Sequence, residues 1–260
     1  MKFIQISDIH LVAPGERLYG LDPRERFERC IADINDQHAD AELVVITGDL
    51  TQQGDERAYR LLGELLGRLK MPVHLLIGNH DHRQRFQAVF PAAAKDSNGF
   101  VQFCIETSAG RFIGLDTNEP GTHKGRLCRQ RLGWLDARLQ EAAGRPVYLF
   151  MHHAPLAVGL REMDVIALQD SHLLADIVTA RGNVRHIFIG HLHRSLSGSW
   201  LGVPFSTLPG TNHQVALDFV VEHVVPGSHE PPAYAVVFAS PEATLVHLRN
   251  FTDETATFNL

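Results

Sequence analysis

Short runs of consecutive apolar residues recur along the chain, each about the length of a β-strand. Their residues are mostly branched or aromatic, and the runs are largely apolar rather than strictly alternating between apolar and polar positions. Such runs are typical of strands that are buried on both faces of a sheet. We therefore predict five buried strands, at residues 2–7, 43–47, 73–77, 147–151 and 186–189.

The segments between these runs carry the spacing of amphipathic helices. Residues 56–69 are the clearest example, because several leucines of this segment fall on one side of a helix. Comparable patterns predict helices at residues 23–37, 129–142 and 171–179. Strands that alternate with helices indicate an α/β protein with a largely parallel sheet.

Two further parts of the chain predict additional strands. In residues 101–115, two strand-like runs flank the turn sequence Ser108-Ala109-Gly110, so we predict a β-hairpin. From about residue 197 onward more strand-like runs follow, which fits a second sheet packed on the first. The Pro/Gly-rich stretch 225–232 is too short for an interdomain linker. We expect residues 1–260 to form a single domain, in which the β-rich part 197–260 serves as a cap or a dimerisation element.

Polar residues that suit metal binding follow each of the five predicted buried strands. They are Asp8, His10, Asp49, Asn79, His80, Asp81, His152, His153, His191 and His193. The carboxyl ends of the strands in an α/β sheet open onto one crevice, so we expect these residues to converge. Taken singly, each is explained by a turn or a helix cap, but their recurrence at five strand ends favours a common site. Glycine precedes Asp49, Asn79 and His191, where it permits close approach of backbones.

The donor atoms of these residues decide which ligand the site would take. Carboxylate, amide and imidazole groups offer oxygen and nitrogen, which suits Mn, Fe, Zn, Co or Mg, and the donors are too many for one ion. Two divalent ions about 3.5–4 Å apart repel each other by roughly 20 kcal/mol at an effective dielectric constant of about 20. A bridging carboxylate and a bridging hydroxide would offset this repulsion, and the hydroxide is then a nucleophile. The site stays locally cationic and would attract an anionic substrate.

Composition narrows the classes of protein. The 16 histidines are an excess, and histidine is the commonest metal ligand. The 24 Lys+Arg against 30 Asp+Glu give a charge of −6 without a basic block, which argues against binding of nucleic-acid backbone. Three widely spaced cysteines suit a reducing compartment. The first residues have too short an apolar run for a signal peptide or a membrane span, so we expect a cytoplasmic protein without membrane attachment.

The motifs DxH, GD, GNHD, HH and GHxH, in this order between Asp8 and His193, resemble those of the calcineurin-like binuclear metallophosphoesterases. The neighbourhoods GTHKGRL, MHHAPL and LPGTNHQV are similar to the branch of class III cyclic-nucleotide phosphodiesterases and glycerophosphodiesterases. The resemblance implies a four-layer αββα sandwich of two mixed sheets flanked by helices. It also implies two divalent metal ions, chiefly Fe or Mn, with Zn, Co and Mg open.

The resemblance also implies a role for each matching residue. One ion would be held by Asp8, His10, Asp49 and His193, and the other by Asn79, His152 and His191, with Asp49 bridging both. His80 would act on the phosphate without binding metal, and Asp81 would hold the His80 ring through its other nitrogen. Asn79, His80 and His213 would contact the substrate.

The family branch implies hydrolysis of a small phosphodiester by the metal-bridging hydroxide. Cyclic nucleotides, glycerophosphodiesters and aryl or alkyl diesters remain open as substrates, and relatives in this branch lead us to expect a homo-oligomer. A phosphomonoesterase of the same fold is the alternative, and a non-catalytic interaction scaffold is disfavoured by the intact ligand set. Two further histidines, His82 and His153, have modest claims to line the pocket, whereas His123 is expected in a solvated loop.

Overall fold

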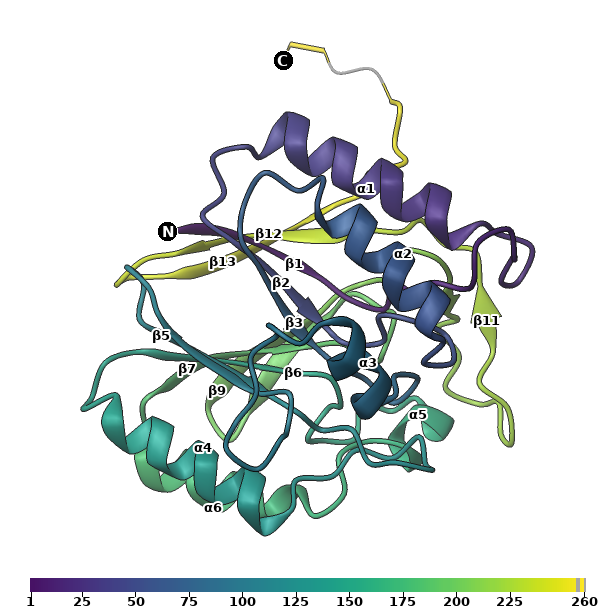
Figure 1. The fold of residues 1–260 in the computed structure, drawn as a ribbon. Helices are drawn as coiled ribbons and strands as arrows, with labels where there is room; N and C mark the ends of the chain where they lie inside the picture. Colours follow the sequence, from purple (N-terminus) through teal and green to yellow (C-terminus); the bar gives the residue numbers. More distant parts are fainter. Residues whose placement is uncertain (256–257, 260) are drawn as a thin grey trace.

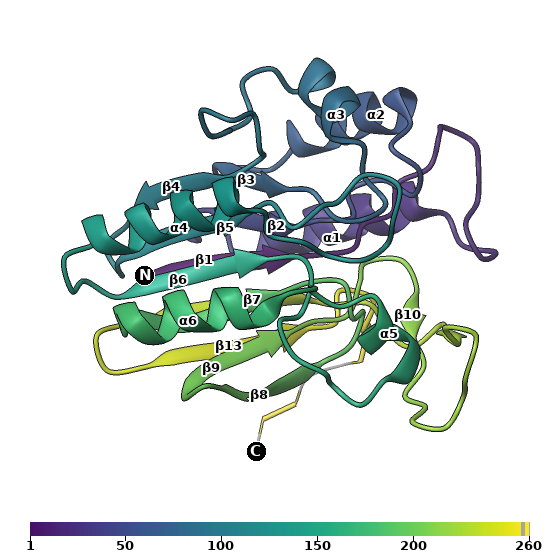
Figure 2. The same cartoon turned by 90° about the horizontal axis from the view of Figure 1, so that it is seen from below.

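Two β-sheets lie face to face in the middle of the molecule, and helices cover their outer faces (Figures 1 and 2). The structure is a computed structural model that describes residues 1–255 and 258–259. Both sheets are mixed, and the layers run helix, sheet, sheet, helix. The predicted αββα sandwich is therefore confirmed.

The first sheet joins the two ends of the chain. Its strands, in spatial order, are β13 (Thr244–Arg249), β12 (Tyr234–Ala239), β1 (Lys2–Ile6), β2 (Val44–Thr47) and β3 (Val73–Leu76). β1, β2 and β3 run parallel, whereas β12 is antiparallel to β1 and to β13. The helices α1 (Pro23–Gln37) and α2 (Glu56–Leu66) cover its outer face (Figure 1).

The second sheet has six strands. In spatial order they are β4 (Phe103–Glu106), β5 (Arg111–Leu115), β6 (Val147–Met151), β7 (Val184–Ile189), β9 (Val203–Thr207) and β8 (Leu196–Trp200). β5, β6, β7 and β9 are parallel, and α4 (Arg129–Glu141) and α6 (Ser171–Arg181) cover the outer face (Figure 2). The shorter elements are α3 (Arg83–Val89), α5 (Arg161–Val165) and the paired strands β10 (Gln214–Val215) and β11 (Gly227–Ser228).

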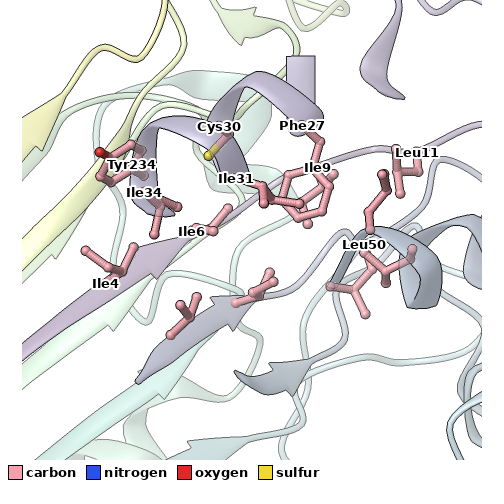
Figure 3. Packing of buried hydrophobic residues seen from close by; sticks show 14 of the residues in the cluster. Ile4, Ile6, Ile9, Leu11, Phe27, Cys30, Ile31, Ile34, Leu50 and Tyr234 are labelled. Carbon is pink, nitrogen blue, oxygen red and sulfur yellow. The ribbon is translucent and has the colours of Figure 1, made fainter. Parts of the chain in front are cut away.

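Helix α1 shows why the apolar spacing of the sequence produces this layer. Asp22 caps the helix by accepting hydrogen bonds from the backbone N–H groups of its first turn, at 3.0 and 3.3 Å. Phe27, Ile31 and Ile34 then fall on one face and pack onto Ile4 and Ile6 of β1 (Figure 3). The amphipathic pattern therefore places α1 on the outer side of the first sheet.

The opposite face of β1 contributes to an aromatic core between the two sheets. Phe3 points into this core, where its ring lies 4.9 Å from that of Phe112 on β5 and 5.4 Å from that of Phe188 on β7. Phe150 on β6 stacks on Phe188 with ring centres 4.9 Å apart. Successive side chains of one strand thus enter different cores, which confirms burial on both faces for β1. β3 differs, because it lies at the edge of the first sheet and is only partly buried.

The C-terminal strands are distributed differently from the expectation. They do not build the second sheet by themselves, because β8 and β9 extend the second sheet while β12 and β13 complete the first. The reason is that β1 and β7 each have a free edge that accepts a further strand, with Phe3 opposite Val237 and Ile187 opposite Phe205. The hairpin of β4 and β5 is confirmed. The cap or dimerisation role of residues 197–260 stays a prediction.

Candidate metal centre

The polar residues that follow the five buried strands lie together at one end of the two sheets. Asp8, His10 and Asp49 come from the first sheet, and His191 and His193 from the second. Donor atoms of Asp8, His10, Asp49 and His193 all lie within 4.8 Å of one another, and these four side chains are buried. The predicted convergence of the strand ends is therefore confirmed, whereas metal ligation by them stays a prediction.

Asp49 lies between two groups of candidate ligands. In the first group its Oδ2 is 3.5 Å from His10 Nε2, which is in turn 3.0 Å from His193 Nε2. In the second group the same Oδ2 is 3.3 Å from His152 Nε2, which also lies 3.0 Å from Asn79 Oδ1. This position suits a carboxylate shared by two cations.

Hydrogen bonds behind the histidines fix which nitrogen faces inward. Nδ1 of His10 lies 2.7 Å from the Gln52 side-chain oxygen, Nδ1 of His193 2.8 Å from the His213 carbonyl, and Nδ1 of His152 2.8 Å from the Thr47 carbonyl. Because oxygen accepts in each pair, each Nδ1 is the donor and the neutral ring keeps a lone pair on Nε2. Metal-binding histidines are oriented in this way by an acceptor behind the ring.

The inward-facing atoms fit metal cations. The Nε2 lone pairs of His10 and His193 point at each other across 3.0 Å, which requires a proton or a cation between them. Nε2 of His191 is buried and has no hydrogen-bond partner among the described residues, and such atoms are costly unless a ligand satisfies them. The donors are all oxygen and nitrogen, so the residues present fit two divalent ions.

Electrostatics at the site favour positive charge. Burial alone would lower the pKa of His152, but Asp49 outweighs it and raises this pKa to about 9. Burial would raise the pKa of Asp49, but the nearby histidines lower it. The net result is a pKa well below the usual range of an aspartate. Burial drives the pKa of His191 well below its ordinary value. The ionised Asp49 carboxylate thus favours positive charge at His152, and a divalent cation that bound there would displace the imidazole proton.

The backbone around the site is strained. Five of the ten non-glycine residues with positive φ in the described part of the chain are candidate ligands, namely Asp8, His10, Asp49, His191 and His193. Each such conformation costs about 1–2 kcal/mol, and strain of this kind is concentrated at functional sites. Glycine is required at position 78 for a steric reason, because a Cβ there would lie 2.2 Å from Asp49 Oδ1. The backbone is thus bent to turn five donors inward.

His80 lies beside these ligands and is held differently from the expectation. Its Nδ1 donates to the Gln52 carbonyl at 2.9 Å, and its ring lies 4.9 Å from that of His10. The Asp81 carboxylate does not hold this ring. It accepts hydrogen bonds from the backbone N–H groups of Gly78 and Leu50, at 2.9 and 3.0 Å, because it points back under the loop.

Asp81 instead joins the loops that follow β2 and β3. It also accepts from the Thr51 N–H at 3.1 Å and from the Tyr59 hydroxyl at 3.0 Å. Burial raises the pKa of Asp81 to about 6, and the charge of Asp49 acts in the same direction. The predicted role of Asp81 toward His80 is therefore wrong, and its observed contacts hold the backbone of both loops.

Of three other histidines, one lines the pocket and two make hydrogen bonds that support the surrounding structure. His213 lines the pocket, with its ring 4.9 Å from that of His10. His153 is packed below the surface, where its Nδ1 is 2.7 Å from Thr117 Oγ1 and its Nε2 is 3.1 Å from the His123 carbonyl. Both of its ring nitrogens are therefore engaged. His82 caps α3 through its Nδ1, which accepts from a backbone N–H at 3.4 Å.

His123 is exposed, as expected of a solvated loop, but it also lines the pocket. Its Nδ1 lies 2.9 Å from Asn79 Nδ2 and its ring 5.0 Å from that of His80. Because the Asn79 amide nitrogen donates to His123, the amide oxygen is left facing His152. The sequence did not indicate this contact of His123 with a candidate ligand.

Sequence reasoning missed Gln52 and the tripeptide Asp116–Asn118. The tripeptide follows β5 in the same way as the candidate ligands follow their strands. Asn118 donates to the carbonyls of Gly78 and Asp81. The sequence contains an indication of this, because an apolar run ends in consecutive polar residues here too. The hairpin prediction concerned only the other end of this strand.

The candidate ligands open into one pocket of about 570 Å³, a size typical of small-molecule sites. The lining of the pocket includes polar groups such as Asp49, Asn79 and His80. It also includes apolar side chains, contributed by Met163, Ile166, Val215 and Val225. Among the described residues, no helix combines the length and apolar character needed to cross a bilayer.

Fold and site together define an αββα sandwich protein with a candidate binuclear metal centre at the carboxyl ends of its strands. The model of the calcineurin-like phosphoesterase family matches residues 1–195. The chain belongs to this family, as its motifs predict.

Two curated relatives align along most of this chain. A "probable cyclic nucleotide phosphodiesterase" of Rhodopseudomonas palustris is 43% identical over 263 residues, covering 100% of this chain and 96% of that protein. A "probable glycerophosphodiester phosphodiesterase" of Arcobacter nitrofigilis is 32% identical and covers 94% of this chain and 91% of that protein. The solved structure of a dimetal phosphatase from Danio rerio has a TM-score of 0.74 at 16% identity, covering 97% of this chain and 96% of that chain. The last likeness concerns the fold.

Proposed function

We propose that this protein is a phosphoric diester hydrolase that uses two divalent metal ions to cleave small phosphodiesters. The observation that carries the proposal is the position of Asp49, whose Oδ2 lies 3.5 Å from His10 and 3.3 Å from His152, between two groups of donors. The names of the two relatives, a cyclic nucleotide and a glycerophosphodiester phosphodiesterase, support diesters over monoesters.

The proposed ligand sets follow the two groups. Asp8, His10, Asp49 and His193 would hold one ion, and Fe and Mn are the favoured metals for both ions. The other would be held by Asn79, His152, His191 and the shared Asp49. When bound, the ions would supply charge that polarises phosphoryl oxygens and activates water.

His80 would act on the phosphate itself. Its Nδ1 is engaged by the Gln52 carbonyl, so Nε2 is the nitrogen left to donate to a phosphoryl oxygen or to the departing alkoxide. A fixed donor beside the reacting phosphate stabilises developing charge without reorganisation. Asn79, His80 and His213 would contact the substrate, since all three line the pocket.

The apolar side chains of the pocket lining would contact the organic groups of the diester. A monoester carries one such group and a diester two, so apolar lining in the same pocket as the candidate ligands suits the second group. Cyclic nucleotides, glycerophosphodiesters and aryl or alkyl diesters all belong to this class. The protein would be a cytoplasmic homo-oligomer, and its three free cysteines are compatible with a reducing compartment.

The proposal is tested by metal analysis combined with a substrate comparison. The purified chain is expected to contain two divalent ions and to hydrolyse a bis-aryl phosphate, cyclic AMP or glycerophosphodiesters faster than an aryl phosphate monoester. Chelation should abolish turnover, and Mn²⁺ or Fe²⁺ should restore it. A metal-replete protein that prefers the monoester would contradict diester hydrolysis, whereas a protein that neither binds metal nor turns over with added Mn²⁺ would contradict the enzyme assignment.

A further inference from the structure

The segment directly after β5, residues Asp116–Asn118, carries buried polar side chains that are not candidate ligands. Asp116 has no exposed surface and Asn118 is 3% exposed. Burial of polar side chains is costly unless their hydrogen bonds are made, so the partners of these residues indicate what they do.

Asn118 holds both ends of the loop that carries Asn79 and His80. Its Nδ2 donates to the carbonyl of Gly78 at 2.6 Å and to the carbonyl of Asp81 at 3.2 Å. One amide group therefore contacts the residues on either side of the Asn79-His80 pair. The candidate ligand Asn79 lies within this two-point attachment.

Asn118 is in turn held by a buried ion cluster. The Arg83 guanidinium donates to both oxygens of Asp116, at 2.7 and 3.0 Å, and to the Asn118 carbonyl at 2.7 Å. Arg131 is 2% exposed and donates to the Asp116 and Asn118 carbonyls, at 3.0 and 2.9 Å. The centre of the Phe100 ring lies 5.2 Å from the guanidinium carbon of Arg83 and 4.6 Å from that of Arg131.

This cluster connects the two sheets next to the candidate centre. Asp116 and Asn118 follow β5 of the second sheet, whereas Gly78 and Asp81 follow β3 of the first. The bidentate contact of Arg83 with Asp116 has little freedom to slide, because an Arg–carboxylate fork fixes both distance and orientation. The position of the 78–81 loop is thereby set by the second sheet.

We propose that Asn118 is a positioning residue that directs Asn79 toward one of the two metal ions, an inference that rests on the proposed function. Among the proposed ligands, Asn79 serves the ion held by His152 and His191, while the ion held by Asp8, His10 and His193 does not depend on it. Loss of the Asn118 amide therefore affects one ion selectively. A residue that merely stabilised the fold would affect both ions alike.

The test compares Asn118→Ala with Asn183→Ala as a matched control. Asn183 makes the same kind of bond, donating through Nδ2 to the Leu139 carbonyl at 3.0 Å, but it precedes β7 at the end opposite to His191. Metal-free proteins are titrated with Mn²⁺ by calorimetry and by electron paramagnetic resonance, and their urea unfolding is measured in parallel. Asn118→Ser, which keeps one donor, is included in case Asn118→Ala does not fold.

We expect two binding steps in the wild-type chain and in Asn183→Ala. In Asn118→Ala one step should be retained and the other weakened by about 10–100-fold, the usual effect of losing a residue that orients a metal ligand. Asn118→Ser should show a smaller effect on the same step. Two unchanged steps, or two steps weakened equally, would overturn the inference while leaving the proposed function intact. A wild-type chain that does not bind two ions would overturn both.

Discussion

Asp49 is the residue at which the two groups of candidate ligands meet. Its carboxylate approaches His10 and His152 and also accepts the His80 N–H at 2.9 Å. Asp49→Ala is therefore expected to weaken both metal-binding steps, each by more than the roughly 10–100-fold that follows from losing a residue that only orients a ligand. Metal content by mass spectrometry and turnover of a bis-aryl phosphate are the measurements.

A matched control separates this effect from the loss of a negative charge. Asp40 is an exposed carboxylate that pairs with Lys2 at 2.7 Å, far from the pocket lining. Asp40→Ala should keep both ions and full activity. An Asp49→Ala protein that stays metal-loaded and active would rule out the shared ligand.

Substitution of His80 should lower the rate of hydrolysis without affecting metal binding. Because its Nδ1 is held by the Gln52 carbonyl, its ring is oriented independently of the candidate ligands. His80→Ala is expected to retain both ions and to lose about 10²–10⁴-fold in kcat, the usual contribution of a positioned acid or base. Steady-state kinetics and metal analysis on one preparation test this.

The exposed His172 on α6 supplies the control for His80. His172→Ala should leave kcat and metal content unchanged. If His80→Ala instead loses its metal together with its activity, His80 is a ligand or a structural residue and the proposed role is wrong.

At the scale of elements, His186 ties β7 to β9 within the second sheet. Its Nε2 lies 2.9 Å from Ser206 Oγ, and its ring packs 4.4 Å from that of Phe188. Burial lowers the pKa of His186 to about 4. The unfolded chain, with a histidine pKa of about 6.5, therefore binds this proton at a higher pH than the folded chain does.

The expected consequence is a pH-dependent loss of stability below about pH 6.5. The contribution of His186 to the free energy of unfolding is fully present above this pH and falls until the pH reaches about 4. The loss amounts to about 2 kcal/mol at pH 5. His186→Gln cannot titrate, so its free energy of unfolding should fall less between pH 7 and pH 5 than that of the wild-type chain. Urea unfolding of both metal-free proteins measures the difference, and equal losses would show that burial of His186 is not responsible.

At the scale of the whole molecule, both sheets supply the candidate centre. Asp8 and Asp49 follow strands of the first sheet, and His152, His191 and His193 follow strands of the second. Bound ions would therefore stabilise the packing of one sheet on the other. Removal of the ions would leave like charges and lone pairs facing one another, as at His10 and His193.

Thermal unfolding should consequently depend on metal. An ion that binds only the folded chain adds about 2.7 kcal/mol at a free concentration of 100 Kd. For a chain of this size the melting temperature should rise on the order of 5–10 °C per site. Calorimetric scans with Mn²⁺ and with chelator test this, with Asp49→Ala as the comparison. A wild-type melting temperature that does not respond to Mn²⁺ would contradict the metal centre.

Much of the fold was predictable because each local pattern agrees with its tertiary environment. The run at residues 147–151 is apolar at every position, and the structure places β6 there, buried on both faces. The helix predicted at 56–69 ends earlier, at Leu66, because Gly67 and the residues after it turn back toward β3. Periodicity indicates which face is buried, whereas the end of an element depends on its capping contacts.

The candidate ligands were predictable for a similar reason. The residues that hold them in place through hydrogen bonds were not. A strand end followed by Asp or His is visible in the sequence, since chain direction alone brings parallel strand ends to one edge. The role of Asp81 and the contact of His123 with Asn79 were not predictable, because their partners, such as the Leu50 N–H and the Asn79 amide, come from other loops. Hydrogen bonds require positions accurate to a few tenths of an ångström, which sequence spacing does not give.

The sequence by itself determined the order of strands and helices, the residues at the strand ends and the chemistry of their donor atoms, because these follow from side-chain type and local periodicity. Only the tertiary structure decided that the C-terminal strands divide between both sheets, that Asp81 holds two loops rather than His80, and that Asn118 secures the loop of Asn79. These outcomes depend on which distant segments share an edge or a hydrogen bond. That choice is made by the packing of the whole chain.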